Sequence, residues 1–159
     1  MGVLALAILF LFHKKYSLRG SIYLGVTVFV TLFLLETAVV VRYCGILSHG
    51  FGIDLWVGIN RILHGNHPQV DTICNIAAFV PFGFFLSKFL ASMKRFGTWH
   101  RILLSTLAAL GLSLCIEVLQ LVLKVGFFEV TDLVLNTAGG FLGASLSAVG
   151  RRVFRLQVK

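Results

Sequence analysis

The chain has 159 residues, of which 58% are apolar and only 13% are charged, and its formal net charge is +8. A soluble domain of this length exposes too much surface to be this apolar, so the composition excludes a soluble globular fold and indicates helices in a lipid bilayer. The basic residues lie almost wholly between apolar runs, a pattern that indicates membrane topology and argues against nucleic-acid binding.

Five apolar runs follow one another along the chain. The first, Gly2–Phe12, covers about 16 Å, roughly half of a bilayer core. The other four are each predicted to form a transmembrane helix, and they span Ser21–Val41, Thr72–Leu86 (or to Leu90), Ile102–Leu123 and Val130–Val149. The sequence therefore predicts an all-α integral membrane bundle of four to five transmembrane helices, in a single domain over residues 1–159.

One long connection, Arg42–Val70, separates the second run from the third. Its apolar segment Ile53–Ile59 contains Trp56, a residue type that favours the interface between lipid and water. We expect this segment to form a short interfacial helix.

The distribution of Lys and Arg predicts the orientation. Three segments hold 11 of the 14 basic residues: the connection between the first and second runs, the connection between the third and fourth runs, and the C-terminal tail. These residues are Lys14, Lys15, Arg19, Lys88, Lys94, Arg95, Arg101, Arg151, Arg152, Arg155 and Lys159. Short connections rich in basic residues stay in the cytoplasm. We therefore expect a multi-pass protein with a cytoplasmic C-terminus, and with Arg42–Val70 and the Lys124–Glu129 turn outside.

Three pairs of polar residues interrupt the apolar runs, and each pair is a carboxylate followed by a carboxamide: Asp71 with Asn75, Glu117 with Gln120, and Asp132 with Asn136. Spacings of three or four residues place both members of a pair on one helical face. On the predicted topology, all three pairs and Glu36 lie in the outer half of the bundle. The sequence therefore predicts an acidic, outward-opening polar pocket, with Arg42 beside it.

A second interpretation of these pairs is structural. A carboxylate inside a transmembrane helix costs about 2.5–3.5 kcal/mol on insertion scales and normally faces the bundle interior or a watery cavity. Hydrogen bonds between helices return about 0.6 kcal/mol each, so the same pairs are also compatible with a role in helix assembly alone.

Proline and glycine mark two further helical segments. Pro81 lies in mid-helix, where it removes a backbone hydrogen bond and predicts a bend, and Gly83 follows it. Gly139 and Gly143 form a GxxxG pattern that permits close approach of two helices. We interpret both as structural motifs.

Metal ligands are scarce. His64 and His67 lie in the long connection with Gly65 between them, whereas a zinc site needs three or four ligands in fixed geometry. A hard cation held by the carboxylates stays an alternative, but the sequence predicts neither a metal site nor a cofactor.

The polar and glycine motifs together resemble the VanZ-like family. They read Asp71…Asn75-x-x-x-Phe79-x-Pro81-Phe82-Gly83, then Glu117-x-x-Gln120, then Asp132-x-x-x-Asn136-Thr137-x-Gly139-Gly140-x-x-Gly143. The resemblance covers about residues 42–148 and leaves the run at 2–12 unmatched. Many members of the family have a Gly-Arg pair before the last block. This chain has Val125-Gly126-Phe127 there and lacks the arginine.

The resemblance implies a bacterial plasma-membrane protein that lowers susceptibility to lipoglycopeptide antibiotics of the teicoplanin type. Its partner would be a membrane lipid or a lipid-linked cell-wall precursor at the outer face, bound by an acidic centre of Glu117 and Asp132. Two alternatives stay open: an intramembrane enzyme that acts on a lipid or isoprenoid headgroup, since paired carboxylates can perform acid–base chemistry, and a structural or accessory membrane subunit.

Overall fold

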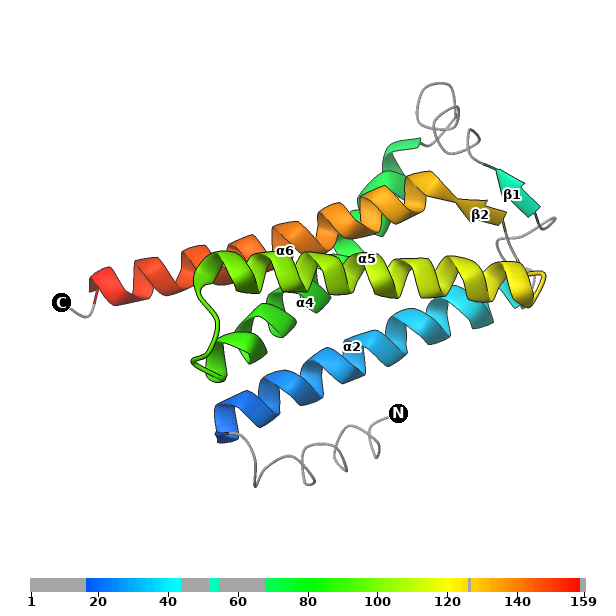
Figure 1. Ribbon diagram of the computed structural model, residues 1–159. Coiled ribbons are helices and arrows are strands. Elements are labelled where there is room, and N and C mark those ends of the chain that lie inside the picture. Colours follow the sequence, from blue (N-terminus) through cyan, green and yellow to red (C-terminus); the bar gives the residue numbers. More distant parts are fainter. Residues whose placement is uncertain (1–16, 44–51, 55–67, 126, 158–159) are drawn as a thin grey trace.

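The structure is a computed structural model that describes residues 17–43, 52–54, 68–125 and 127–157. Most of these residues belong to helices, namely α2 (Leu18–Tyr43), α4 (Pro68–Ser92), α5 (Thr98–Val122) and α6 (Val130–Gln157) (Figure 1). The first apolar run, 2–12, lies outside the described residues.

Each of these helices is long and apolar enough to cross a membrane. The candidate spans are Leu18–Val39, Thr72–Ser92, Thr98–Val122 and Val130–Gly150. They coincide with the four long apolar runs of the sequence, so the all-α, multi-pass membrane bundle is confirmed.

The helices alternate in direction. Helices α2 and α5 end where α4 and α6 begin, as Figure 1 shows. We call this end of the bundle the strand end, because two short strands lie there. The opposite end, where α2 begins at Leu18, α4 ends at Ser92 and α5 begins at Thr98, is called the basic end.

The strands β1 (Gly52–Asp54) and β2 (Phe127–Glu129) pair in parallel, with Gly52 opposite Phe127 and Asp54 opposite Glu129. The expectation of an interfacial helix from Ile53 was wrong for Ile53 and Asp54, and residues 55–59 lie outside the described part of the chain. Strand pairing satisfies some of the backbone groups of β2, and the isoleucine and phenylalanines of the pair favour extended structure.

Small residues lie where α5 meets α6, since a Cβ atom on Gly140 of α6 would collide with the side chain of Ala109 on α5. Ser105, Ala109 and Ser113 are spaced by four residues on α5 and are completely buried, as are Ala144 and Ser147 on α6. Large apolar side chains such as Phe33, Leu107 and Phe141 are exposed instead. Lipid solvates large apolar side chains, whereas small residues let helix backbones approach closely, so this arrangement suits a bilayer.

Glycines bring α6 directly against the backbone of α4. A Cβ atom on Gly139 would collide with the carbonyl oxygen of Ile76, and one on Gly143 with that of Val80. On α4, a Cβ on Gly83 would collide with the carbonyl oxygen of Gly140. Pro81 lies within α4, which continues past it to Ser92, and its side chain is exposed.

Candidate functional site

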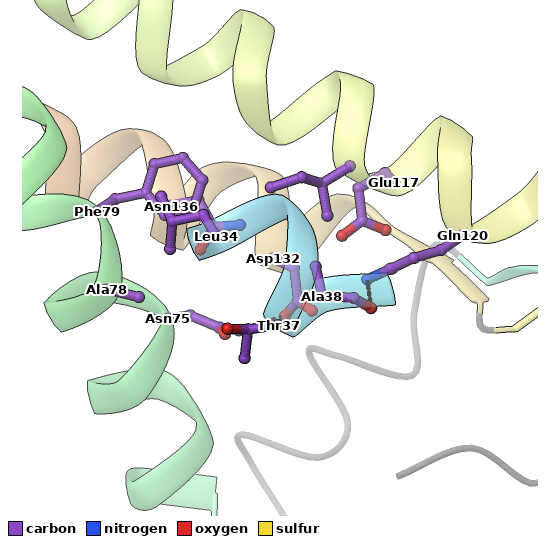
Figure 2. A pocket seen from close by; sticks show the side chains of 11 residues that line it. Leu34, Thr37, Ala38, Asn75, Ala78, Phe79, Glu117, Gln120, Asp132 and Asn136 are labelled. Carbon is purple, nitrogen blue, oxygen red and sulfur yellow. Dashed lines mark hydrogen bonds between the residues drawn. The ribbon is translucent and has the colours of Figure 1, made fainter. Parts of the chain in front are cut away.

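All four helices contribute to one cavity of about 180 Å³ in the strand half of the bundle (Figure 2). We call it the polar cavity. Its lining residues are Leu34, Thr37 and Ala38 from α2; Asn75, Ala78 and Phe79 from α4; Ile116, Glu117 and Gln120 from α5; and Asp132 and Asn136 from α6.

Helix α5 supplies the most deeply buried polar groups of this cavity. Glu117 is 1% exposed, and its Oε2 accepts a hydrogen bond of 2.8 Å from the backbone N–H of Glu129. Gln120 is 2% exposed and donates from Nε2 to the carbonyl oxygen of Ala38 at 3.2 Å. Among the described residues, Gln120 Oε1 has no hydrogen-bond partner. A buried acceptor without a partner favours a ligand that donates a hydrogen bond.

Helices α4 and α6 are joined across the polar cavity by side chains. Asn75 donates from Nδ2 to Oδ1 of Asp132 at 2.7 Å. Asp132 lies in the first turn of α6, where the helix dipole stabilises a negative charge. Asn136 donates from Nδ2 to Oγ of Ser113 at 2.9 Å, which links α6 to α5.

The polar cavity unites five of the sequence-predicted site residues: Asn75, Glu117, Gln120, Asp132 and Asn136. Asp71 occupies the start of α4 and Arg42 the end of α2, but their side chains lie outside the described part of the structure.

The placement of Glu36 in the pocket was wrong, since its side chain is exposed and absent from the lining of the polar cavity. Leu34, Thr37 and Ala38 share the helical face that lines the cavity. Glu36 is two residues from Leu34 and two from Ala38, which turns it to the opposite face.

Sequence reasoning missed three polar contributors. Thr37 lines the polar cavity and donates to the carbonyl oxygen of Phe33 at 2.8 Å. Ser113 lies four residues before Glu117, a spacing that places it on the same face and was available in the sequence. Glu129 belongs to the turn that the sequence places outside, yet it is only 4% exposed. No pattern in the sequence signals that burial.

The polar cavity is rich in acceptors and acidic. Its lining holds two carboxylates and three carboxamides, and none of the described lining residues is basic. Such a site attracts hydroxyl, amide N–H or ammonium groups and disfavours phosphate, because like charges repel in a low-dielectric site. Within the described residues, no group of three or more His, Cys, Asp and Glu could hold a metal ion.

Comparison with known proteins identifies the family. The model of the VanZ/LLP1 family matches residues 3–151, which includes most of the N-terminal apolar run as well as the motif-bearing helices. The chain is 33% identical over 82 residues to Protein VanZ of Enterococcus faecium. This alignment covers 52% of the chain and 47% of that protein, so the chain spans about half the length of this curated relative. No solved structure matches the chain. Because the family model covers nearly the whole sequence, the chain belongs to the VanZ/LLP1 family.

Proposed function

We propose that this protein lowers susceptibility to teicoplanin-type lipoglycopeptides by acting on a lipid or lipid-linked wall precursor at the outer face of the plasma membrane. Family membership supports the link to these antibiotics, because the name-giving member is associated with low-level teicoplanin resistance. The observation that carries the proposed site is the polar cavity, in which Glu117 and Asp132 lie among three carboxamides inside the membrane-spanning bundle.

Energetics favours a functional role for the two carboxylates over helix assembly alone. Placing one carboxylate in a transmembrane helix costs about 2.5–3.5 kcal/mol. A hydrogen bond between membrane helices returns about 0.6 kcal/mol, so at least about four such bonds per carboxylate would offset that cost. Two carboxylates in one cavity are therefore better explained by a ligand than by packing.

The chemistry of the polar cavity indicates which groups of the ligand it would bind. Carboxylate oxygens, carboxamide oxygens and the acceptor Oε1 of Gln120 all require donors. In this proposal the polar cavity binds hydroxyl, amide or ammonium groups of a lipid headgroup or a lipid-linked sugar–peptide, with Glu117 and Asp132 as the acidic centre. The phosphate of the same ligand stays outside the polar cavity.

The double variant Glu117→Gln/Asp132→Asn tests this function. Both substitutions remove a negative charge while keeping the side-chain shape and one acceptor oxygen, so the hydrogen bonds to Glu129 N–H and Asn75 Nδ2 persist. We expect the minimum inhibitory concentration of teicoplanin to fall to that of cells lacking the protein, with membrane abundance unchanged. Both quantities are measured in the same cultures.

Glu36→Gln is the matched control, because it removes an exposed carboxylate that does not line the polar cavity. It should retain full protection. Full protection in the double variant would refute the proposed site, and a loss of protection in step with abundance would favour the assembly role instead.

The orientation belongs to this proposal too: the strand end faces outward, and the basic end and the C-terminus face the cytoplasm. The excess of basic residues at the basic end supports it. In a chain whose Cys44, Cys74 and Cys115 are replaced, an impermeant maleimide applied to intact cells should label His64→Cys and spare Lys94→Cys. The reverse labelling pattern would contradict the orientation.

A further inference from the structure

A second cavity, of about 290 Å³, lies at the basic end and belongs to no part of the proposed function. We call it the basic cavity. It is lined by Ser17, Arg19 and Tyr23 at the start of α2, by Lys88, Ala91 and Ser92 at the end of α4, and by Lys94 in the connection to α5. Three lining residues carry a positive charge and three carry a hydroxyl group, whereas the polar cavity is lined by carboxylates.

The charge of the basic cavity is separated from the acidic residues of the chain. The sequence holds six Asp and Glu, and each of them lies in a strand or in the strand half of its helix. The side chains that line the basic cavity therefore carry a total formal charge of +3. All acidic residues lie toward the other end of the bundle. A hollow surrounded by cations attracts an anion, because Coulomb attraction strengthens in the low dielectric of a membrane boundary.

The basic cavity lies at the depth of lipid headgroups. The candidate span of α2 begins at Leu18 and that of α4 ends at Ser92, so the lining extends from just outside the spans, at Ser17 and Lys94, to Tyr23 and Lys88 just inside them. Tyrosine is enriched at this interface, and basic pockets between transmembrane helices on the cytoplasmic side suit anionic lipid headgroups.

Hydrogen bonds, a close approach of two helices and a cation–π contact fix the positions of residues that line the basic cavity. Ser17 Oγ accepts the backbone N–H of Gly20 at 3.3 Å, and Ser92 Oγ donates to the carbonyl oxygen of Phe89 at 2.7 Å. A Cβ atom on Gly20 would lie 2.5 Å from Ser92 Oγ, so α2 and α4 approach closely beside the cavity. Lys88 Nζ lies 5.3 Å from the centroid of the Phe84 ring, within the range of a cation–π contact.

We propose that the basic cavity binds a phosphate group, supplied by the headgroup of an anionic phospholipid. A tetrahedral phosphate accepts hydrogen bonds from several directions, and the lining offers a guanidinium, ammonium groups and hydroxyls from three chain segments. The volume equals that of about ten water molecules at roughly 30 Å³ each, which leaves room for a phosphate group. On the orientation proposed above, this lipid belongs to the inner leaflet.

Lys94 gives the sharpest test, because its backbone has φ 55°, a left-handed conformation that glycine adopts more readily than lysine. Lys94→Gly removes the ammonium group and relieves the backbone, so a loss of binding cannot be attributed to a loss of folding. Lys124→Gly is the matched control, since Lys124 has φ 56° and is exposed at the strand end. Thermal unfolding should find both variants at least as stable as the wild type.

Lipid binding is measured by native mass spectrometry of the purified full chain, titrated with dioleoylphosphatidylglycerol or dioleoylphosphatidylcholine. We expect a preference for phosphatidylglycerol that weakens about fivefold in Lys94→Gly and again about fivefold on adding Arg19→Gln, with Lys124→Gly unchanged. Equal affinity for the two lipids in the wild type, or equal phosphatidylglycerol affinity in the wild type and the double variant, overturns an anionic phospholipid headgroup as the ligand.

A second arm titrates inorganic phosphate and follows the thermal unfolding midpoint. Saturable stabilisation by phosphate that is lost in Lys94→Gly, without a phosphatidylglycerol preference, keeps the phosphate site and assigns it to a soluble source. The absence of a Lys94-dependent response to both phosphatidylglycerol and inorganic phosphate overturns the proposal.

Discussion

Gly139→Ala/Gly143→Ala is expected to destroy the contact between α4 and α6. The added methyl groups would meet the carbonyl oxygens of Ile76 and Val80, and these backbone atoms cannot rotate away as a side chain can. Overpacking costs typically about 1–3 kcal/mol per site, and two sites on one interface approach the total stability of a small domain, about 5–15 kcal/mol. The folded fraction in detergent, measured by size-exclusion chromatography, and the thermal midpoint should both fall sharply.

Gly111→Ala on α5 is the matched control. A Cβ atom at Gly111 finds no neighbour within 4 Å, and alanine favours a helix over glycine by about 1 kcal/mol. This variant should match or exceed the stability of the wild type. If Gly139→Ala/Gly143→Ala were as stable as Gly111→Ala, the close approach of α4 and α6 would be wrong.

Two substitutions of Glu117, to alanine and to glutamine, are expected to differ in their effects on stability and on function. In Glu117→Ala the buried N–H of Glu129 loses its acceptor, which costs about 1–3 kcal/mol, and deletion of the buried side chain enlarges the polar cavity at further cost. Glu117→Gln keeps an acceptor oxygen and removes a charge whose insertion costs about 2.5–3.5 kcal/mol. Glu117→Gln should therefore be at least as stable as the wild type, yet confer no protection against teicoplanin.

Unfolding in mixed detergent micelles, measured beside drug susceptibility, checks this comparison. Should Glu117→Gln be destabilised as much as Glu117→Ala, the carboxylate would serve the assembly of the bundle. A stable Glu117→Gln protein without activity would mark its charge as functional.

The helices were predictable because the hydropathy and length of an apolar run determine whether it forms a transmembrane helix. Runs of 20 or so apolar residues satisfy every backbone group internally as helices. The ends were less predictable. Helix α6 continues to Gln157, eight residues beyond the apolar run that ends at Val149, because basic residues such as Arg151 and Arg152 extend a helix without adding hydropathy.

The depth of the candidate site was predictable, whereas the rotation of one helix was not. Two polar residues three or four apart define a face, so Asn75, Gln120 and Asn136 could be assigned to the interior. Helix α2 carries Glu36 as its one charged residue in the apolar run. A single residue gives the depth in the membrane but not the face, and Glu36 lies away from the polar cavity.

The strand pair and the basic cavity could not be predicted from sequence patterns. Three-residue strands such as Gly52–Asp54 carry too few side chains to establish a period of two. The residues Arg19, Lys88 and Lys94 were visible as topology signals, but their arrangement around one hollow depends on how α2 and α4 pack.

The parallel pairing of β1 with β2 also has a consequence for biogenesis. Synthesis proceeds from the N-terminus, so residues 52–54 are made well before residues 127–129, and both belong to the strand end. When Phe127–Glu129 leaves the ribosome, β1 is therefore available as a template on which β2 can align. That alignment fixes the N–H of Glu129, the donor to Glu117. The acidic centre is thus completed only when residues of α5, β2 and α6 are all in place, and a chain that lacks residues 127–129 would carry Glu117 without this donor.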